Sequence, residues 1–411
     1  MDATTKIKHH FEKNRALIEN RLIELTREMV RQKTVNVLSE KLPEHPYLQF
    51  RGEEYRVAEI VTRELERMEI PFEEFSRMKG RPNVIGRLGQ NISGKRLLLP
   101  AHMDVVPAGN GWTHDPFDMI VKDGKLYGRG VEDNKGQLAA ILVASEILKE
   151  LKLDESLSGE LLIAALADEE ITDPDGIDYG IGFLLGKKLI QPTHAIVPDI
   201  GCEMRQIDIA EKGRLVIKIT AHGQQAHGST PEKGINAIFM MNKLLNHLET
   251  VSLPHEPHPV LGSPTLNLGE IHGGAAPNVV PASCVVYIDI RIVPGMTVPK
   301  VMEQLQAAIN RIEGGHFTME LISQSAAFSI DPDNELVRLI QKYTQQELGF
   351  VAQPMGMTGG TYAKNLIAHQ VLTVGWGPGS DTAHTANECI ELQQLMDFTK
   401  IICLIALELL Q

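Results

Sequence analysis

Histidine and carboxylate side chains follow several apolar segments of this chain, at positions where they could act together on a bound ligand. They are His102, Asp133, Glu169 with Glu170, Asp199 and His384. Three of the preceding segments, at 96–99, 161–166 and 194–197, are typical of buried strands, and a fourth, at 371–374, precedes a Gly-rich loop. Ligands of open α/β sheets bind outside the carboxyl ends of the strands, so we expect these side chains to meet. Imidazole and carboxylate without thiolate suit Zn²⁺ in a catalytic site, or Mn²⁺ or Co²⁺.

The segment around His102 and Asp104 has several interpretations when it is taken alone. Residues two apart on a strand share a face, so both side chains can point the same way. Asp104 is then a partner that fixes the tautomer of a metal-binding His102, or a direct ligand. It is equally one half of a hydrogen-bonded pair at a polar strand end.

The other acidic positions also have structural alternatives. Asp133 stands at a loop-to-helix junction between glycines, where it either binds a metal or caps the helix. Glu169 and Glu170 are adjacent carboxylates that repel each other, and they point in different directions, which suits one ligand and one general base. The alternative for this pair is a solvated acidic turn. A lone Asp199 or His384 is more often structural, so it is the whole set that indicates metal-assisted hydrolysis.

Length and composition restrict the class of protein. A chain of 411 residues suggests about two domains, and 43% hydrophobic residues argue against disorder. The net charge of −13 argues against a nucleic-acid partner, because phosphates would not be neutralised. No signal-peptide core or membrane-length apolar stretch occurs, so we expect no membrane partner. The four cysteines form no CxxC motif, which favours a cytoplasmic location with structural, buried thiols.

The order of predicted elements indicates a split α/β domain. Residues 1–35 and 55–68 are expected to be helical, and strands and helices then alternate up to residue 199 and again from residue 334. This alternation predicts a mainly parallel sheet with helices on both faces. We expect one catalytic, metal-binding domain formed by 1–211 and 329–411.

Residues 212–328 are expected to form an inserted domain of a different kind. The predicted order is strand, helix, strand, strand, helix, strand, which is the ferredoxin-like α+β arrangement. The expected ranges are 215–220, 236–248, 265–271, 284–292, 298–312 and 316–322. This domain is predicted to act as a lid and a dimerisation domain.

Four segments together resemble the signature blocks of a co-catalytic metallohydrolase family. They begin at His102, Gly128, Asp168 and His384, and they occur in the family's order between about residues 80 and 395. This family includes carboxypeptidase G, acetylornithine deacetylase, succinyl-diaminopimelate desuccinylase, aminoacylase and the bacterial dipeptidases. The resemblance implies two divalent metal ions per chain, zinc first, with manganese or cobalt as alternatives.

The resemblance also implies roles for individual residues. His102 and Asp199 would bind one metal, Glu170 and His384 the other, and Asp133 would bridge them before a cis peptide to Asn134. Glu169 would be the general base toward a bridging water, and Asp104 would support His102.

The inserted domain resembles the family in two further segments, and the chain has a third near residue 360. His227, in the segment 223–231, would stabilise the oxyanion, either in its own subunit or across a homodimer. Asn278 and Arg291 would hold a substrate carboxylate, since arginine offers a bidentate fork. Gly360 and Thr361 lie in a stretch that is similar to the Gly-rich substrate loop of dipeptidases.

The choice between branches of the family depends on a few positions. Asp199, the block from Gly128 to Gly136 and the 359–362 segment favour a peptidase that cleaves dipeptides or short peptides with a free carboxylate. The short inserted domain and the segment after His384 keep an N-acyl-amino-acid deacylase as the close alternative. A non-catalytic ligand-binding homologue, or a scaffold with coincidental polar strand ends, would lack metal binding or one of the matched residues.

Overall fold

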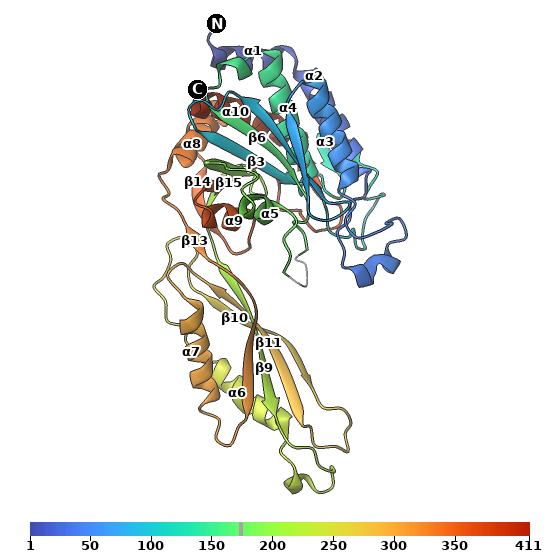
Figure 1. Ribbon diagram of the computed structural model, residues 1–411, viewed down its shortest axis with the longest axis vertical. Coiled ribbons are helices and arrows are strands. Elements are labelled where there is room, and N and C mark those ends of the chain that lie inside the picture. The colour runs from blue at the N-terminus through green and yellow to red at the C-terminus, as the bar shows by residue number, and fades with distance from the viewer. Residues whose placement is uncertain (172–175) are drawn as a thin grey trace. The chain divides into compact units, whose positions relative to one another are not determined.

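The structure is a computed structural model that describes residues 1–171 and 176–411, and it divides into two compact units. The first consists of Met1–Ile209, Asp331–Pro354 and Thr361–Gln411, and the second of Ala210–Ile330 and Met355–Gly360. The sequence placed the inserted domain at 212–328 and did not include the short segment that precedes Thr361. Both units are labelled by element in Figure 1.

The first unit contains most of a large mixed sheet, of which β13 and the ends of β8 and β14 belong to the second unit. Its strand order is β1-β2-β6-β3-β7-β15-β8-β13, and β14 also pairs with β8. The strand bounds are β1 Phe72–Ser76, β2 Pro82–Gly89, β3 Arg96–His102, β6 Glu160–Leu166, β7 His194–Val197, β8 Gln206–Glu211, β13 Phe328–Ser329, β14 Gln353–Met357 and β15 Leu372–Gly375. The chain passes from the first unit to the second within β8.

The expected parallel sheet is confirmed at the centre of this sheet but not at its edges. Strands β6, β3, β7 and β15 run parallel. The β1–β2, β2–β6, β15–β8 and β8–β13 pairs are antiparallel, so the sheet is mixed. All seven residues of β6 are buried, and so is β3 from Leu97 onward. Continuous apolar strands of this kind are covered on both faces, and their carboxyl ends lie along one edge.

Helices cover the sheet and pack on one another (Figure 1). Helices α2, α4 and α10 contact each other, and α4 and α10 both contact β3 and β6. Other helices contact other strands of the sheet: α3 contacts β2, and α8 and α9 contact β15. The bounds are α1 Ala3–Lys13, α2 Arg15–Val30, α3 Tyr55–Arg67, α4 Lys135–Glu150, α5 Ile181–Gly186, α8 Glu335–Leu348, α9 Ala363–Ala368 and α10 Leu392–Leu410.

The N-terminal helix expected over 1–35 is in fact two helices. Asn14 leaves the helical region, with φ −110° and ψ 19°, and stands between α1 and α2. Asparagine competes for backbone hydrogen bonds and favours such positions. The apolar spacing continues across the break, so the spacing alone did not reveal it.

A separate sheet of three short strands was not predicted. Its order is β16-β5-β4, with β4 Ile120–Lys122, β5 Lys125–Tyr127 and β16 Cys389–Glu391. Strand β16 pairs with β5 in antiparallel register, Cys389 opposite Tyr127. This pairing brings the segment after His384 next to the segment before Asp133.

The second unit has the ferredoxin-like arrangement that the sequence predicts. Its four-stranded sheet has the order β10-β11-β9-β12, and all neighbouring strands are antiparallel. Helices α6 and α7 contribute buried side chains to the hydrophobic core that this sheet helps to form. The bounds are β9 Gly213–His222, α6 Ala237–Leu248, β10 Thr265–Gly273, β11 Ser283–Ile292, α7 Val298–Ile309 and β12 Phe317–Ser325. Alternate residues of β9 and β11 are buried, as expected for a sheet with one helical face.

Two expectations from composition concern membranes and cysteines. Among the described residues, no helix is long and apolar enough to cross a membrane. The four cysteines are unpaired, but only Cys284 and Cys403 are buried, so the expectation of buried thiols is wrong for Cys202 and Cys389. Those two belong to loop and edge segments rather than to the core.

We expect Ile288→Ala to destabilise the second unit by about 2–5 kcal/mol, because Ile288 is fully buried in its core and the change leaves a cavity. Differential scanning calorimetry of the full chain measures the effect. The matched control is Ile322→Ala in the same sheet, where the side chain is 51% exposed and little change is expected. Equal destabilisation by both variants would contradict this account of the core.

Candidate metal centre and active site

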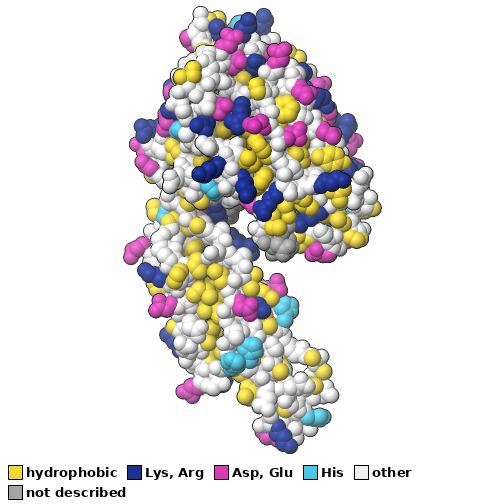
Figure 2. All heavy atoms as spheres, in the orientation of Figure 1, with side chains coloured by type: hydrophobic (Ala, Val, Ile, Leu, Met, Phe, Trp, Pro, Cys, Tyr) yellow, Lys and Arg dark blue, Asp and Glu magenta, His cyan; other side chains and the backbone are white. Residues whose placement is uncertain are grey.

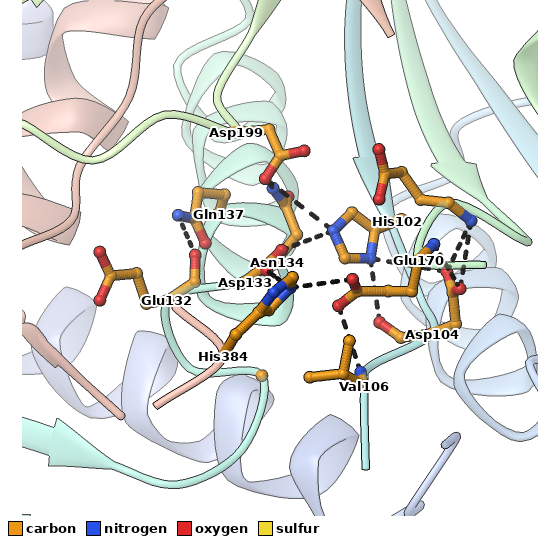
Figure 3. Close-up of polar contacts among 12 residues, drawn as sticks. His102, Asp104, Val106, Glu132, Asp133, Asn134, Gln137, Glu170, Asp199 and His384 are labelled. Atoms are coloured by element: carbon orange, nitrogen blue, oxygen red, sulfur yellow. Dashed lines mark hydrogen bonds and ion pairs between the residues drawn. The ribbon is translucent and has the colours of Figure 1, made fainter. Parts of the chain in front are cut away.

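The central strands deliver the candidate site residues to one edge of the sheet. His102 is the last residue of β3, Glu169 and Glu170 follow β6, and Asp199 follows β7. Asp133 comes from the loop of residues 128–134 between β5 and α4, here called the Asp133 loop. His384 comes from the loop of residues 376–388 between β15 and β16, here called the His384 loop. The structure brings these side chains together (Figure 3).

Asp133 lies between the two imidazoles. Its Oδ1 is 2.7 Å from His102 Nε2, and its Oδ2 is 3.0 Å from His384 Nε2. The peptide bond that follows, from Asp133 to Asn134, is cis, as the resemblance implied. One carboxylate that presents an oxygen to each of two imidazoles has the geometry expected of a bridging ligand.

Glu170 and Asp199 complete the ring of donors around Asp133 (Figure 3). Glu170 Oε2 is 3.0 Å from His384 Nε2, and its Oε1 accepts the Val106 N–H at 3.2 Å. Asp199 Oδ1 is 3.9 Å from His102 Nε2 and accepts the side-chain amide of Asn134 at 2.8 Å. Asn134 is the N-cap residue of α4, but its side chain makes no capping bond and instead orients Asp199.

Asp104 contacts His102 chiefly through its backbone carbonyl. The closer partner of His102 Nδ1 is the backbone carbonyl of Asp104, at 2.9 Å, while the carboxylate Oδ1 is 3.5 Å away. The carboxylate instead accepts the N–H groups of Glu169 and Glu170, each at about 3.1 Å, and the side-chain amide of Asn36 at 2.8 Å. Asp104 therefore fixes the tautomer of His102 through its carbonyl and the Glu169–Glu170 turn through its carboxylate.

Buried negative charge dominates the electrostatics of the cluster. Burial and the charge of Asp133 raise the pKa of Asp199 to about 7. Burial and the charge of Asp199 raise the pKa of Glu169 well above its usual range. Hydrogen bonds to Asp133 and Glu170 raise the pKa of His384 to about 10. Carboxylates this close ionise together only when cations lie among them.

The donor atoms fit divalent metal ions. Ligand atoms of His102, Asp133 and Glu170 lie within 4.8 Å of one another, and so do those of His102, Glu169 and Asp199. The two groups share His102 and therefore form one continuous cluster. Imidazole nitrogen and carboxylate oxygen are the donors of catalytic zinc sites. Glu169 is close enough to be a ligand as well as a base.

Several residues that hold the site were missed in the sequence. Buried Arg81 forms ion pairs with Asp168 and Glu54 and donates to Asn36, which in turn donates to Asp104. No local motif marks Arg81, Glu54 or Asn36, because they come from separate segments outside the matched blocks. Glu132 and Glu388 were also missed as parts of the site, although both lie within the matched blocks. The available signal was a second acidic residue in each block, Glu132 beside Asp133 and Glu388 after His384.

Within the second unit, His227 and Asn278 lie together. Gly228 N–H donates to Asn278 O at 2.8 Å, and His227 Nδ1 accepts the N–H of Ser229 at 3.0 Å. Both predicted residues are exposed. They are thus available to a ligand at this end of the unit.

Arg291 does not join His227 and Asn278 within one copy of the unit. It lies near the end of β11, whereas Asn278 precedes the strand, and the eight steps from Ser283 to Arg291 span ~26 Å. Arg291 Nε instead donates to Asp289 at 2.8 Å, and its Nη1 is 3.4 Å from the Thr358 carbonyl.

Gly360 and Thr361 lie at a boundary between the two units. Gly360 ends a segment of the second unit, and Thr361 begins a segment of the first. Thr361 Oγ1 accepts the N–H of Ala363 at 3.1 Å at the start of α9. The Thr361 hydroxyl therefore makes a local hydrogen bond with the backbone at the start of α9.

Comparison with known proteins assigns the chain to a family. The sequence matches the model of the peptidase family M20/M25/M40 over residues 98–408, and the chain belongs to this family. It is 33% identical to the acetylornithine deacetylase of Proteus mirabilis over 326 residues, which cover 76% of this chain and 79% of that protein. An uncharacterized metallohydrolase of Methanocaldococcus jannaschii is 29% identical over 348 residues, covering 78% and 82%.

A solved structure shows the same fold at lower sequence identity. A tripeptidase from Staphylococcus aureus superposes with a TM-score of 0.74 at 20% identity, covering 95% of this chain and 98% of that one. The chain is therefore an enzyme of the metallopeptidase and amidohydrolase class, in a metal-dependent family. The resemblance drawn from the sequence motifs is confirmed.

We expect metal-replete protein to hold about two divalent ions per chain, because Asp133 offers an oxygen to each side of the cluster. Elemental analysis after dialysis against excess Zn²⁺ measures this ratio. His384→Ala is expected to lower it to about one, since among the described residues His384 alone supplies an imidazole on that side. A ratio near two in His384→Ala would contradict this assignment.

Proposed function

We propose that the enzyme hydrolyses an amide bond in dipeptides or other short peptides that carry a free carboxylate. The observation that supports this most strongly is the placement of Asp133 between His102 and His384, with Glu169 in the same buried cluster. Such a cluster combines ligands for metal ions with a carboxylate that remains available as a base.

Two divalent ions, of which zinc suits the donors best, would be held by His102, Asp133, Glu170, Asp199 and His384. When bound, they supply Lewis-acid polarisation of the scissile carbonyl and acidify water. Glu169 accepts the proton of the attacking water and passes it to the leaving amine. Its backbone N–H is held by Asp104, which fixes the position of the base.

The second unit contributes substrate recognition in this proposal. His227 donates a hydrogen bond to the oxyanion, Asn278 and Arg291 bind the substrate carboxylate, and Gly360 and Thr361 line the substrate loop. Because Asn278 precedes β11 and Arg291 lies near the other end of this strand, one carboxylate cannot contact both in a single copy. A homodimer through the second unit would supply one of them from the other subunit.

Exposed apolar side chains support that dimer. Ile238 and Phe239 at the start of α6 and Ile271 on β10 are exposed, and Ile238 lies close to Gly273 at the end of β10. Strand β10 is an edge of its sheet, so its outer backbone groups can pair with another strand. Figure 2 shows hydrophobic side chains at the surface of this unit.

A second candidate function is the deacylation of N-acyl amino acids. The 33% identity to an acetylornithine deacetylase favours it. Both reactions cleave an amide next to a free carboxylate, and they differ in whether the substrate carries a free amine or an acyl group. For the cellular setting, the unpaired cysteines support a cytoplasmic enzyme.

We expect Glu169→Gln to lower kcat by ~10²–10⁴-fold while metal content is unchanged, because the change removes a proton acceptor and keeps the size of the side chain. Steady-state kinetics and elemental analysis of the same sample test this. Glu59→Gln, an exposed carboxylate on α3, is the control and should behave like the wild type. Full activity in Glu169→Gln would assign the base to another residue.

We expect a substrate panel to show the highest kcat/KM for dipeptides, and Arg291→Ala to raise KM ~10–100-fold for them. C-terminally amidated dipeptides should be much less affected, since they lack the carboxylate that arginine binds. The panel includes N-acetyl and N-succinyl amino acids, and Arg311→Ala, exposed in the same unit, is the control. Preference for the N-acyl compounds would select the deacylase, and equal KM effects on acid and amide would remove the role of Arg291.

A further inference from the structure

Two buried glutamates, Glu132 and Glu388, connect the Asp133 loop and the His384 loop through hydrogen bonds. Glu388 is fully buried at the end of the His384 loop. Its Oε1 accepts the backbone N–H groups of Gly130, Glu132 and Asp133, at 3.0, 2.9 and 3.1 Å. Its Oε2 pairs with Arg129 Nη1 at 2.5 Å. One carboxylate from the His384 loop thus holds three backbone donors of the Asp133 loop.

Glu132 makes the reciprocal connection. This residue of the Asp133 loop is buried, and its Oε1 accepts the N–H of Asp381 at 2.7 Å. Its Oε2 accepts the N–H of Thr382 at 2.9 Å and also the Thr382 hydroxyl. Each loop therefore supplies a carboxylate that binds backbone N–H groups of the other.

Several residues of the His384 loop have unfavourable backbone conformations, so contacts from outside the loop are needed to stabilise them. Asp381, His384 and Asn387 all have φ near +60°, a region that non-glycine residues rarely adopt. The His384 side chain is 57% exposed, so packing does little to place it. Strained conformations persist where surrounding contacts determine them, and Glu132 supplies such contacts two and three residues before His384.

The close approach of Gly379 is independent evidence that the Glu132 carboxylate packs closely against the His384 loop. A Cβ at this residue would lie 2.7 Å from Glu132 Oε1, and its φ is +146°. The backbone approaches the carboxylate at a distance that only glycine allows.

We propose that Glu132 and Glu388 are positioning residues: Glu132 places His384, Glu388 places Asp133, and together they set the affinity of the metal cluster that these two ligands join. The two side chains form a reciprocal clasp, defined by the hydrogen bonds given above. Glu388 acts on the backbone N–H of Asp133 itself, and Glu132 acts on the loop that carries His384. The inference rests on the proposed metal-binding role of these two ligands.

If the two glutamates contributed only to the stability of the fold, both variants would weaken metal binding alike. The clasp instead predicts that each variant affects the two sides of the metal cluster differently. Glutamine keeps the size of either side chain but places an amide donor where a backbone or arginine N–H now donates. Glu132→Gln should therefore disturb the His384 side of the cluster and leave the His102 side unchanged. Glu388→Gln should disturb both sides, because both imidazoles contact Asp133.

The test is a Zn²⁺ titration of the full-length apo-protein in competition with a chromophoric chelator. We expect Glu132→Gln to weaken one of two binding steps ~10–100-fold, and Glu388→Gln to weaken both. The matched control is Glu64→Gln. Glu64 is as buried as Glu132, at 4%, and pairs with three arginines on helices α2 and α3, remote from the donors in sequence. It should lower stability without changing either binding step.

The outcomes separate the inference from the proposed function. Two tight sites in the wild type beside unchanged binding in both clasp variants would overturn the clasp alone. Equal weakening by Glu64→Gln would also overturn it, because the effect would then follow stability. A wild type that binds no Zn²⁺ would overturn the proposed function and the clasp with it. If the glutamine variants do not fold, Gly379→Ala, which displaces Glu132 without changing charge, should weaken the same single step, and unchanged binding would count against the clasp.

Discussion

The contact of one carboxylate with two imidazoles organises the catalytic unit. Asp133 meets His102 and His384, which are separated by 282 positions along the chain, and Glu170 and Asp199 close the ring around them. Burial, and after it the charge of neighbouring carboxylates, raises the pKa values of Glu169, Glu170 and Asp199. Divalent cations held by these donors would relieve this repulsion.

The fold produces this contact in two stages. Parallel central strands end at one edge of the sheet and deliver His102, Glu169, Glu170 and Asp199 there. The remaining two donors come from loops, whose backbones have less intrinsic order. Asp104, Glu132 and Glu388 each bind backbone N–H groups with a carboxylate and thereby place these turns and loops. Rigid strands and anchored loops together pre-organise the cluster.

The sequence alone predicted the elements that have a regular hydrophobic pattern and the site residues that directly follow a strand. Strands β3, β6 and β7 were visible as apolar runs, and the ferredoxin-like order of the second unit followed from alternating elements. The short strands β4, β5 and β16 were not predicted, because three-residue strands have too little pattern. Arg81 and Asn36 were missed because their role depends on contacts between distant segments. The separation of Asn278 from Arg291 could be recognised only from the length of β11 in the structure.

The family assignment is compatible with either of the two candidate functions. The chain belongs to the peptidase family M20/M25/M40, and it is similar in sequence to an acetylornithine deacetylase and in fold to a tripeptidase. The most direct test of the cluster is a crystal structure of the Zn²⁺-loaded enzyme with anomalous data at the zinc edge. Two anomalous peaks on either side of the Asp133 carboxylate, one beside His102 and Asp199 and one beside Glu170 and His384, are expected. A peak located away from Asp133, or no peak near either imidazole, would contradict this account.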